Sequence, residues 1–294
     1  MKPTGSPKKL YPDISRLVGE VQKVFGGDVA TSGAEGFMIS NVANWIDAGP
    51  LLNPILGDPL RGLPCGFFTE VAGPESSGKT TLGYYLLGQA QKAGCISILA
   101  DVEVSYDAKW ARLQGVNSKQ LIRIASSYVN AKGKFKVDDL DEEFSKWEFI
   151  AKKSWRMFHR PQLLLVDSMA ALIPHEELVG DFGDRNVAPV ARALSKNFRK
   201  FHKVLLETKT HCIFINQMRS KIGVMFGAKE QTSGGRAKNF YFFVRVEVSK
   251  KKTLKNKKIG PFAILSKVRN TKNKLAPPFR TADFRISFTK GIQV

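Results

Sequence analysis

Residues 73–81, which read GPESSGKTT, have the residue types and spacing of a phosphate-binding loop. Glycines let such a loop curl so that its backbone N–H groups point at phosphate oxygens. Lys79 can place its charge on the β- and γ-phosphates of a nucleotide, and Thr80 can offer its hydroxyl to Mg²⁺. We therefore expect ATP and Mg²⁺ here. The expected ATP-binding residues of the loop are Gly73, Pro74, Glu75, Ser76, Ser77, Gly78, Lys79, Thr80 and Thr81.

An acidic residue follows a run of four apolar residues at 163–166. Asp167 comes directly after this run, which is the pattern of a buried strand that ends in a Mg²⁺-holding carboxylate. Many buried strands end in aspartate, so the pattern gains its meaning from the phosphate-binding loop that precedes it. Thr80 and Asp167 are the expected metal ligands.

Two more polar side chains stand at the ends of expected strands. Glu103 follows the strand expected at 95–101, and its carboxylate can deprotonate an attacking water as general base; a capping acid at a strand–helix turn is the alternative. Gln217 ends the strand expected at 211–217 and can hydrogen-bond a γ-phosphate. Because an open α/β sheet builds its site where parallel strands end, we expect Lys79, Glu103 and Gln217 to act together in catalysis.

Apolar runs and helical periodicity alternate along the chain and must position these residues. This alternation predicts an α/β fold with a mostly parallel, twisted sheet flanked by helices and a hairpin-rich edge. Strands are expected at 66–72, 95–101, 162–167, 211–217, 241–248, 261–268 and 283–288, helices at 79–93, 143–158 and 188–206, and a loop near 130–141.

An amphipathic helix is expected at 13–25, before a passage rich in glycine and proline at 47–64. We divide the chain into an N-terminal helix and linker arm, 1–50, and a core, 51–294, that holds the expected ATP site and the binding residues described below. The apolar face of the helix has no obvious partner within its own arm. We therefore expect it to pack on an adjacent subunit in an open polymer, through Ile14, Leu17 and Val21.

The charge balance indicates a polyanionic partner. The 294 residues include 46 Lys and Arg against 26 Asp and Glu, a net charge of +20. Between residues 249 and 280 there are eleven basic and no acidic residues, many of them at the tip of an expected hairpin. Such clustering is typical of nucleic-acid-binding proteins. The absence of a long apolar run argues against a membrane partner, and three unpatterned cysteines indicate a reduced, cytoplasmic protein.

Five motifs, taken in order, resemble those of the RecA recombinase family over nearly the whole chain. They are 73–81, 165–172, 180–184, 215–227 followed by Gly234 and Gly235, and 272–279. The resemblance implies a RecA-type P-loop NTPase core. It also implies an ATP-dependent recombinase that forms helical filaments of its own subunits on single-stranded DNA, pairs that strand with homologous double-stranded DNA and promotes strand exchange. DNA would stimulate its ATP hydrolysis.

The resemblance also implies residue roles, and it supports Glu103 as base and Gln217 as γ-phosphate sensor. Asp107 and Trp110 match adenine contacts, while Lys272, Lys274 and Phe288 match contacts to a neighbouring subunit's ATP. Phe240 matches an interface aromatic. The positions that match contacts to single-stranded DNA are Val187, Arg192, Ser195, Arg199, Arg219, Lys221, Ile222, Gly234 and Gly235, and those that match contacts to the incoming duplex are Lys250, Lys267 and Arg269.

The chain departs from the family pattern at its C-terminus. It ends at Val294, where the family continues into a C-terminal domain and an acidic tail. We therefore expect a compact, phage-like form that acts in the bacterial cytoplasm. Two other interpretations stay open: a RecA-fold helicase or motor ATPase, and an accessory DNA-binding paralogue that does not exchange strands. A small-molecule kinase fits poorly with the charge of +20.

Overall fold

The computed structural model of the chain describes residues 14–25, 44–130, 132–179, 187–220, 230–232, 237–258 and 260–293. The chain separates into two units, 1–43 and 44–294. In the first unit, α1 (Ile14–Phe25) forms where the amphipathic pattern predicts it, and Leu17, Val24 and Phe25 are largely exposed. The second unit begins with β1 (Trp45–Ile46), which pairs with β2 (Leu63–Pro64). The division at residue 50 stays a prediction.

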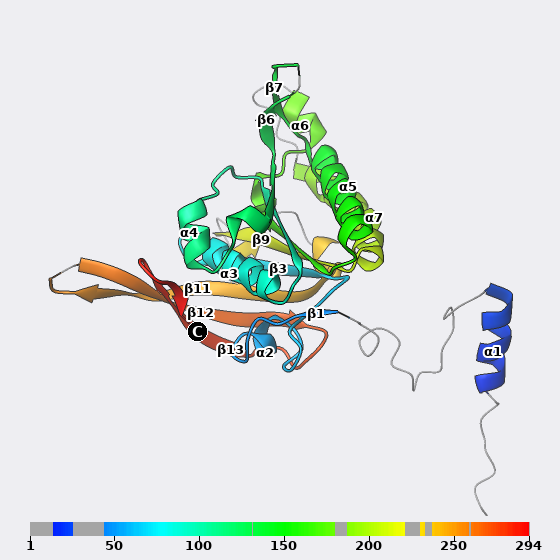
Figure 1. Ribbon diagram of the computed structural model, residues 1–294, viewed down its shortest axis with the longest axis horizontal. Helices are drawn as coiled ribbons and strands as arrows, with labels where there is room; N and C mark the ends of the chain where they lie inside the picture. The colour runs from blue at the N-terminus through cyan, green and yellow to red at the C-terminus, as the bar shows by residue number, and fades with distance from the viewer. Residues whose placement is uncertain are drawn as a thin grey trace, which may run out of the picture. The chain divides into compact units, whose positions relative to one another are not determined.

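A large, mostly parallel sheet forms the centre of the second unit, as the alternating pattern predicts (Figure 1). Its order is β14-β13-β12-β11-β3-β9-β8-β4-β5, and β10 pairs with β9. The strands from β11 to β5 are mutually parallel, and the other pairings are antiparallel. The strands are β3 (Phe68–Gly73), β4 (Ile96–Asp101), β5 (Leu121–Ala125), β8 (Gln162–Asp167), β9 (Thr210–Ser220), β10 (Glu230–Thr232), β11 (Phe242–Asn256), β12 (Gly260–Asn273), β13 (Thr281–Ser287) and β14 (Gly291–Gln293).

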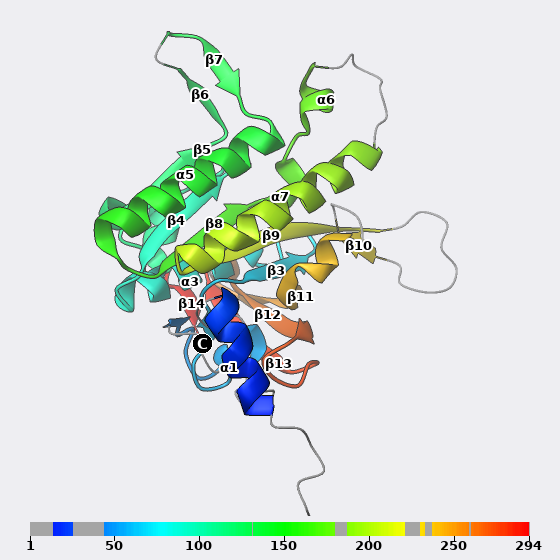
Figure 2. The same ribbon diagram turned by 90° about the vertical axis from the view of Figure 1, so that its right-hand side faces the viewer.

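Helices cover both faces of this sheet and close one apolar core on each. On one face pack α2 (Asn53–Leu56), α3 (Lys79–Lys92) and α4 (Ala108–Leu113). On the other, α5 (Leu140–Phe158) and α7 (Val187–Glu207) lie side by side (Figure 2) and bury an aromatic cluster. The short helices are α6 (His175–Val179), η2 (Ser118–Gln120), η3 (Met169–Ala171) and η4 (Ala237–Phe240).

The prediction of a loop near 130–141 is wrong. β6 (Ser127–Val129) and β7 (Phe135–Val137) form an antiparallel hairpin there, and α5 begins earlier than predicted. Asp139 and Glu142 form a capping box at the start of this helix, a signal visible in the sequence. The strands were missed because three-residue strands with polar neighbours show too little alternation. β5 and β14 were missed as well.

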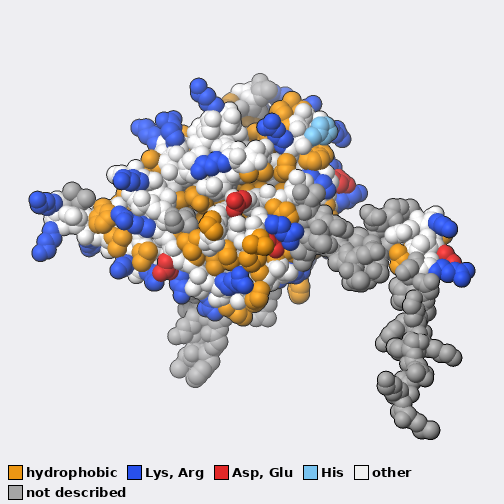
Figure 3. Space-filling model, turned by 60° about the horizontal axis from the view of Figure 1, so that its bottom comes forward, with side chains coloured by type: hydrophobic (Ala, Val, Ile, Leu, Met, Phe, Trp, Pro, Cys, Tyr) orange, Lys and Arg blue, Asp and Glu red, His pale blue; other side chains and the backbone are white. Residues whose placement is uncertain are grey.

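The predicted hairpin of basic residues is a ribbon of two long strands. β11 continues to Asn256, so the lysines at 250–255 lie within a strand. Both faces of this outer part are open to solvent, and the sequence there lacks the alternation that marks a half-buried strand. Lysine and arginine side chains gather at the outer end of the ribbon (Figure 3, left).

Candidate nucleotide-binding site

The phosphate-binding loop joins β3 to α3 and is shaped by glycine. A Cβ on Gly73 would lie 2.1 Å from the carbonyl oxygen of Val248 on β11, so only glycine allows the two backbones to approach this closely. Gly78 adopts a φ of +101° at the start of α3. The loop is also held from β12, where the Ser266 hydroxyl donates to the carbonyl of Ser77 at 2.8 Å.

Lys79 is the first residue of α3, and its side chain is largely buried. Its Nζ donates to the carbonyl of Pro74 at 2.7 Å, which places the ammonium within the loop. Burial lowers the pKa of Lys79, while attraction to Asp167, Glu103 and Glu75 opposes this shift. A phosphate would supply the negative charge that a buried ammonium requires.

Asp167 ends β8 and accepts a hydrogen bond from the hydroxyl of Thr80 at 2.8 Å. The two predicted metal ligands therefore meet. Burial raises the pKa of Asp167 to about 6; the Thr80 hydrogen bond opposes the shift, and repulsion from Glu103 and Asp101 adds to it. A carboxylate held in this environment is stabilised in its charged form by a nearby cation.

Glu103 follows β4, and Gln217 lies within β9, which continues to Ser220 beyond the predicted strand end at 217; the two side chains contact each other. Gln217 Nε2, on β9, donates to Oε1 of Glu103 at 3.3 Å. The hydroxyl of Ser168 donates to the same oxygen. Ser168 directly follows Asp167, so one chain segment contributes both a metal-ligand candidate and a residue that orients the candidate base. Sequence reasoning did not single out Ser168, although its place after a strand-ending acid was a usable signal.

The residues matched to adenine contacts lie at α4. Trp110 Nε1 donates to the hydroxyl of Thr81 at 3.1 Å, which brings this indole to the first turn of α3. Asp107 caps α4 by accepting from the backbone N–H groups of Lys109 at 2.8 Å and Trp110 at 3.1 Å. Trp110 thus lies beside the loop, whereas the Asp107 carboxylate serves its own helix.

Two buried carboxylates that sequence reasoning missed link neighbouring strands through ion pairs. Asp101 accepts from Arg123 Nη2 at 2.6 Å. Glu70, buried on β3, accepts from Arg245 Nε at 2.6 Å and from Asn216 Nδ2 at 2.8 Å, and so joins three adjacent strands. Charged residues within otherwise apolar strands were the available signal, because a buried charge requires a partner.

The residues matched to a neighbouring subunit's ATP have contacts of their own within the chain. Lys272 Nζ donates to the carbonyl of Asn239 at 2.7 Å, and burial lowers its pKa, with repulsion from Lys274. Lys274 Nζ lies 5.2 Å from the centre of the Phe243 ring. Phe288 and Phe240 are 44% and 82% exposed, so both are accessible to a partner.

The candidate DNA contacts fall on α7, β9 and the β11–β12 ribbon. Arg192 and Arg199 are exposed on α7, whereas the Ser195 hydroxyl donates to the carbonyl of Ala191 at 2.8 Å. The side chains of Val187, Arg219 and Ile14 are not described, and Lys221, Ile222, Gly234 and Gly235 lie outside the described residues.

On the ribbon, the three residues matched to duplex contacts do not share one face. Lys267 and Arg269 are two residues apart on β12 and therefore point to the same side. Lys250 pairs with Ser266, whose side chain points to the other side, and a register irregularity follows it between Lys250 and Lys252. Lys267 and Arg269 therefore lie on one face of the ribbon, and Lys250 lies on the opposite face.

Comparison with known proteins decides the family. The model of the RecA N-terminal domain matches residues 13–133 and 157–293. Protein RecA of Leptospira meyeri is 37% identical over 281 residues, which is 95% of this chain and 67% of that protein. Protein RecA of Chlamydia abortus is 36% identical over 281 residues, 95% of this chain and 75% of that protein. The chain belongs to the RecA family.

The match to the RecA family is interrupted at one place. Residues 134–156 lie outside the match, and they hold β7 and most of α5. The loop, Glu103, Asp167 and Gln217 all lie inside it. Among the described residues, no helix is both long and apolar enough to cross a lipid bilayer.

Proposed function

We propose that this protein is an ATP-dependent DNA recombinase. It polymerises on single-stranded DNA, pairs that strand with homologous duplex and exchanges strands, and DNA stimulates its ATP hydrolysis. Membership of the RecA family, with relatives named Protein RecA over 95% of the chain, supports this function. The excess of positive charge supports a polyanionic partner.

The described residues fit the hydrolysis of a nucleoside triphosphate. Lys79 holds the β- and γ-phosphates from within the loop, and the backbone N–H groups at the start of α3 add their dipoles. Glu103 takes the proton of the attacking water, and Ser168 and Gln217 orient its carboxylate through one oxygen. Trp110, beside the first turn of α3, offers an aromatic surface to the base.

Thr80 and Asp167 fit Mg²⁺. They offer a hydroxyl and a carboxylate, the hard oxygen ligands that this ion prefers, and the remaining ligands would come from phosphate and water. The buried Asp167, with its raised pKa, favours a nearby cation. When bound, Mg²⁺ neutralises negative charge that develops on the phosphates during transfer.

The contact between Gln217 and Glu103 carries the proposal that DNA and ATP are coupled. Gln217 lies on β9, which continues to Ser220 and leads directly to Lys221 and Ile222, two candidate contacts to single-stranded DNA. A γ-phosphate that attracts the Gln217 amide would break or reshape its contact with Glu103. Nucleotide state and the conformation of β9 are therefore linked, and the linkage must act in both directions.

The test is ATP hydrolysis and DNA affinity measured on the same protein. Hydrolysis should rise when single-stranded DNA is added, and affinity for a labelled single strand should be higher with ATP than with ADP. Helical filaments and strand exchange with homologous duplex should accompany these activities. Closed rings with strand separation would indicate a motor ATPase instead, and equal DNA affinity with ATP and ADP would contradict the coupling.

A further inference from the structure

The β6–β7 hairpin is the part of the core whose return strand lies outside the family match. Between the two strands, the Asn130 side chain accepts from the backbone N–H groups of Lys132 at 2.9 Å and Lys134 at 3.1 Å. An isolated two-stranded hairpin is at best marginally stable in water, so this one requires an anchor.

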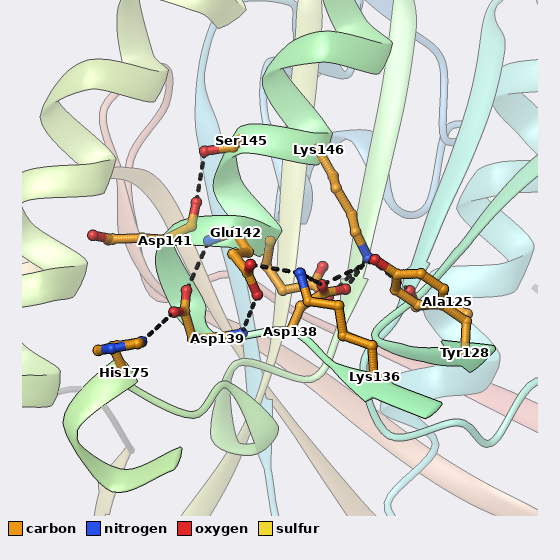
Figure 4. A network of polar contacts seen from close by, with 11 residues as sticks. Ala125, Tyr128, Lys136, Asp138, Asp139, Asp141, Glu142, Ser145, Lys146 and His175 are labelled. Atoms are coloured by element: carbon orange, nitrogen blue, oxygen red, sulfur yellow. Dashed lines mark hydrogen bonds and ion pairs between the residues drawn. The ribbon is translucent and has the colours of Figure 1, made fainter. Parts of the chain in front are cut away.

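The anchor is a network of ion pairs with α5 (Figure 4). Lys136 Nζ lies 2.5 Å from Glu142 Oε1 and 3.3 Å from Asp138 Oδ1. Lys146 pairs with Asp138 and lies 4.4 Å from the centre of the Tyr128 ring. Tyr128 and Lys136 are register partners, so one face of the hairpin is committed to this network.

The network also connects the hairpin with α6. Asp139, two residues after β7, contacts Nδ1 of His175 at 2.8 Å (Figure 4). Helix α6 is followed in the chain by α7, and the hairpin and α6 lie at the same end of the core (Figure 2). The hairpin is therefore joined by a side-chain contact to the helix that precedes α7, on which Arg192 and Arg199 are candidate DNA contacts.

The opposite face of the hairpin and its tip are open to solvent. Val129 and Phe135 are register partners on that face and are 66% and 72% exposed. Lys132 and Lys134 are exposed at the tip, and neither has an ion-pair partner in the described part of the chain. An exposed aromatic ring beside free lysines is the combination that binds unpaired nucleotides, through stacking and through phosphate contacts.

We propose that the β6–β7 hairpin is an additional contact for single-stranded DNA. Lys132 and Lys134 hold backbone phosphates, and Phe135 stacks on an unpaired base. The inference rests on the proposed function, because it assumes that a single strand is bound at all. The acidic residues near the hairpin do not oppose this, because Asp138 and Glu142 are paired with lysines and Asp139 contacts His175 and caps α5.

The experiment measures affinity for a labelled single strand against salt concentration in the full chain. Lys132→Ala with Lys134→Ala should reduce the slope of log affinity against log salt by about 1.4, about 0.7 for each phosphate contact. Lys92→Ala with Lys119→Ala, which removes the same charge from exposed positions elsewhere, should leave the slope unchanged. ATP hydrolysis without DNA and the thermal unfolding midpoint should be unaffected in both variants.

Substitutions of Phe135 separate stacking from a merely apolar contact. Phe135→Ala and Phe135→Leu should both weaken binding about fivefold or more, whereas Phe135→Trp should retain it. If Leu is tolerated and the lysine variants keep the parent's salt slope but polymerise poorly, the hairpin contacts a second copy of the chain and the proposal is wrong. Unchanged binding in every variant also overturns it. A parent protein that fails to bind single strands refutes the proposed function itself.

Discussion

The contacts of individual side chains assign separate roles to Lys79 and Glu103. Lys79→Ala removes the ammonium that lies within the loop, so nucleotide binding should weaken and hydrolysis should be lost. Glu103→Gln keeps the shape and the partners of the side chain but cannot accept the proton of water. Hydrolysis should fall by at least about 100-fold while nucleotide binding is retained. Equilibrium binding of a fluorescent nucleotide and steady-state hydrolysis measure the two effects, and near-normal turnover in Glu103→Gln would move the base elsewhere.

Asp167 gives stability a defined pH dependence. The folded chain keeps the Asp167 proton up to about pH 6, whereas the unfolded chain releases it near 3.8. Between these values the folded form binds more protons, so its stability falls as pH rises through this window. Asp167→Asn should therefore increase the free energy of unfolding at pH 7.5, by up to about 3 kcal/mol, and the gain should vanish near pH 4. The same substitution should impair ATP hydrolysis.

Urea unfolding without nucleotide and with a chelator, at several pH values, measures this effect. Asp107→Asn is the matched control, because Asp107 is exposed and Asn caps helices almost as well as Asp. Its stability should change little and show no comparable pH dependence. A loss of stability in Asp167→Asn at pH 7.5 would contradict this prediction, because it would mean that the charged carboxylate stabilises the folded chain.

At the scale of elements, β9 joins the candidate nucleotide-binding site to Lys221 and Ile222, two candidate contacts to single-stranded DNA. Gln217→Ala removes the donor to Glu103 on that strand. ATP should still bind, yet it should no longer increase affinity for a single strand, so the ratio of the affinities measured with ATP and ADP should fall towards one. Titration of a labelled strand with each nucleotide measures this ratio. A ratio equal to that of the parent would show that coupling does not pass through Gln217.

The two faces of the β11–β12 ribbon allow the candidate duplex contacts to be tested separately, rather than by substituting all three residues at once. Lys267→Ala with Arg269→Ala changes two residues on one face, and Lys250→Ala changes a residue on the opposite face. If one surface holds the incoming duplex, the double variant should lose strand exchange but retain single-strand binding and hydrolysis, and Lys250→Ala should have a smaller effect. Equal losses in both variants would indicate that duplex wraps around the ribbon.

The sequence predicts the sheet well wherever one physical signal dominates. Strands β4 and β8 end in aspartate, β3 leads into the glycine-rich loop, and Gln217 lies on β9. Parallel pairing brings these places together, so the meeting of Lys79, Glu103, Asp167 and Gln217 was predictable. The hairpin near residue 130 was not, because ion pairs between its return strand and α5 stabilise it and its own residues show little pattern. Ser168 was missed because its role depends on the position of another strand's carboxylate.

At the scale of the whole molecule, α1 is the proposed link between subunits. Leu17, Val24 and Phe25 expose apolar surface that a neighbouring subunit would bury. Deletion of residues 1–26 should give a soluble protein that forms no filaments on DNA and binds ATP poorly, since the proposed ATP site lacks its neighbour's Lys272 and Lys274. Electron microscopy and sedimentation test this. Filaments of normal length from the shortened chain would show that subunits join elsewhere.

Strand β12 has a mechanical consequence. Ser266 points inward and holds the carbonyl of Ser77 in the phosphate-binding loop, while the next residue, Lys267, points outward on the ribbon. Because these two residues are adjacent, a load applied to the ribbon acts on the same strand that contacts the loop. Tension on a duplex held there should therefore change the rate at which nucleotide leaves, and Ser266→Ala should make that rate less sensitive to force in an optical trap.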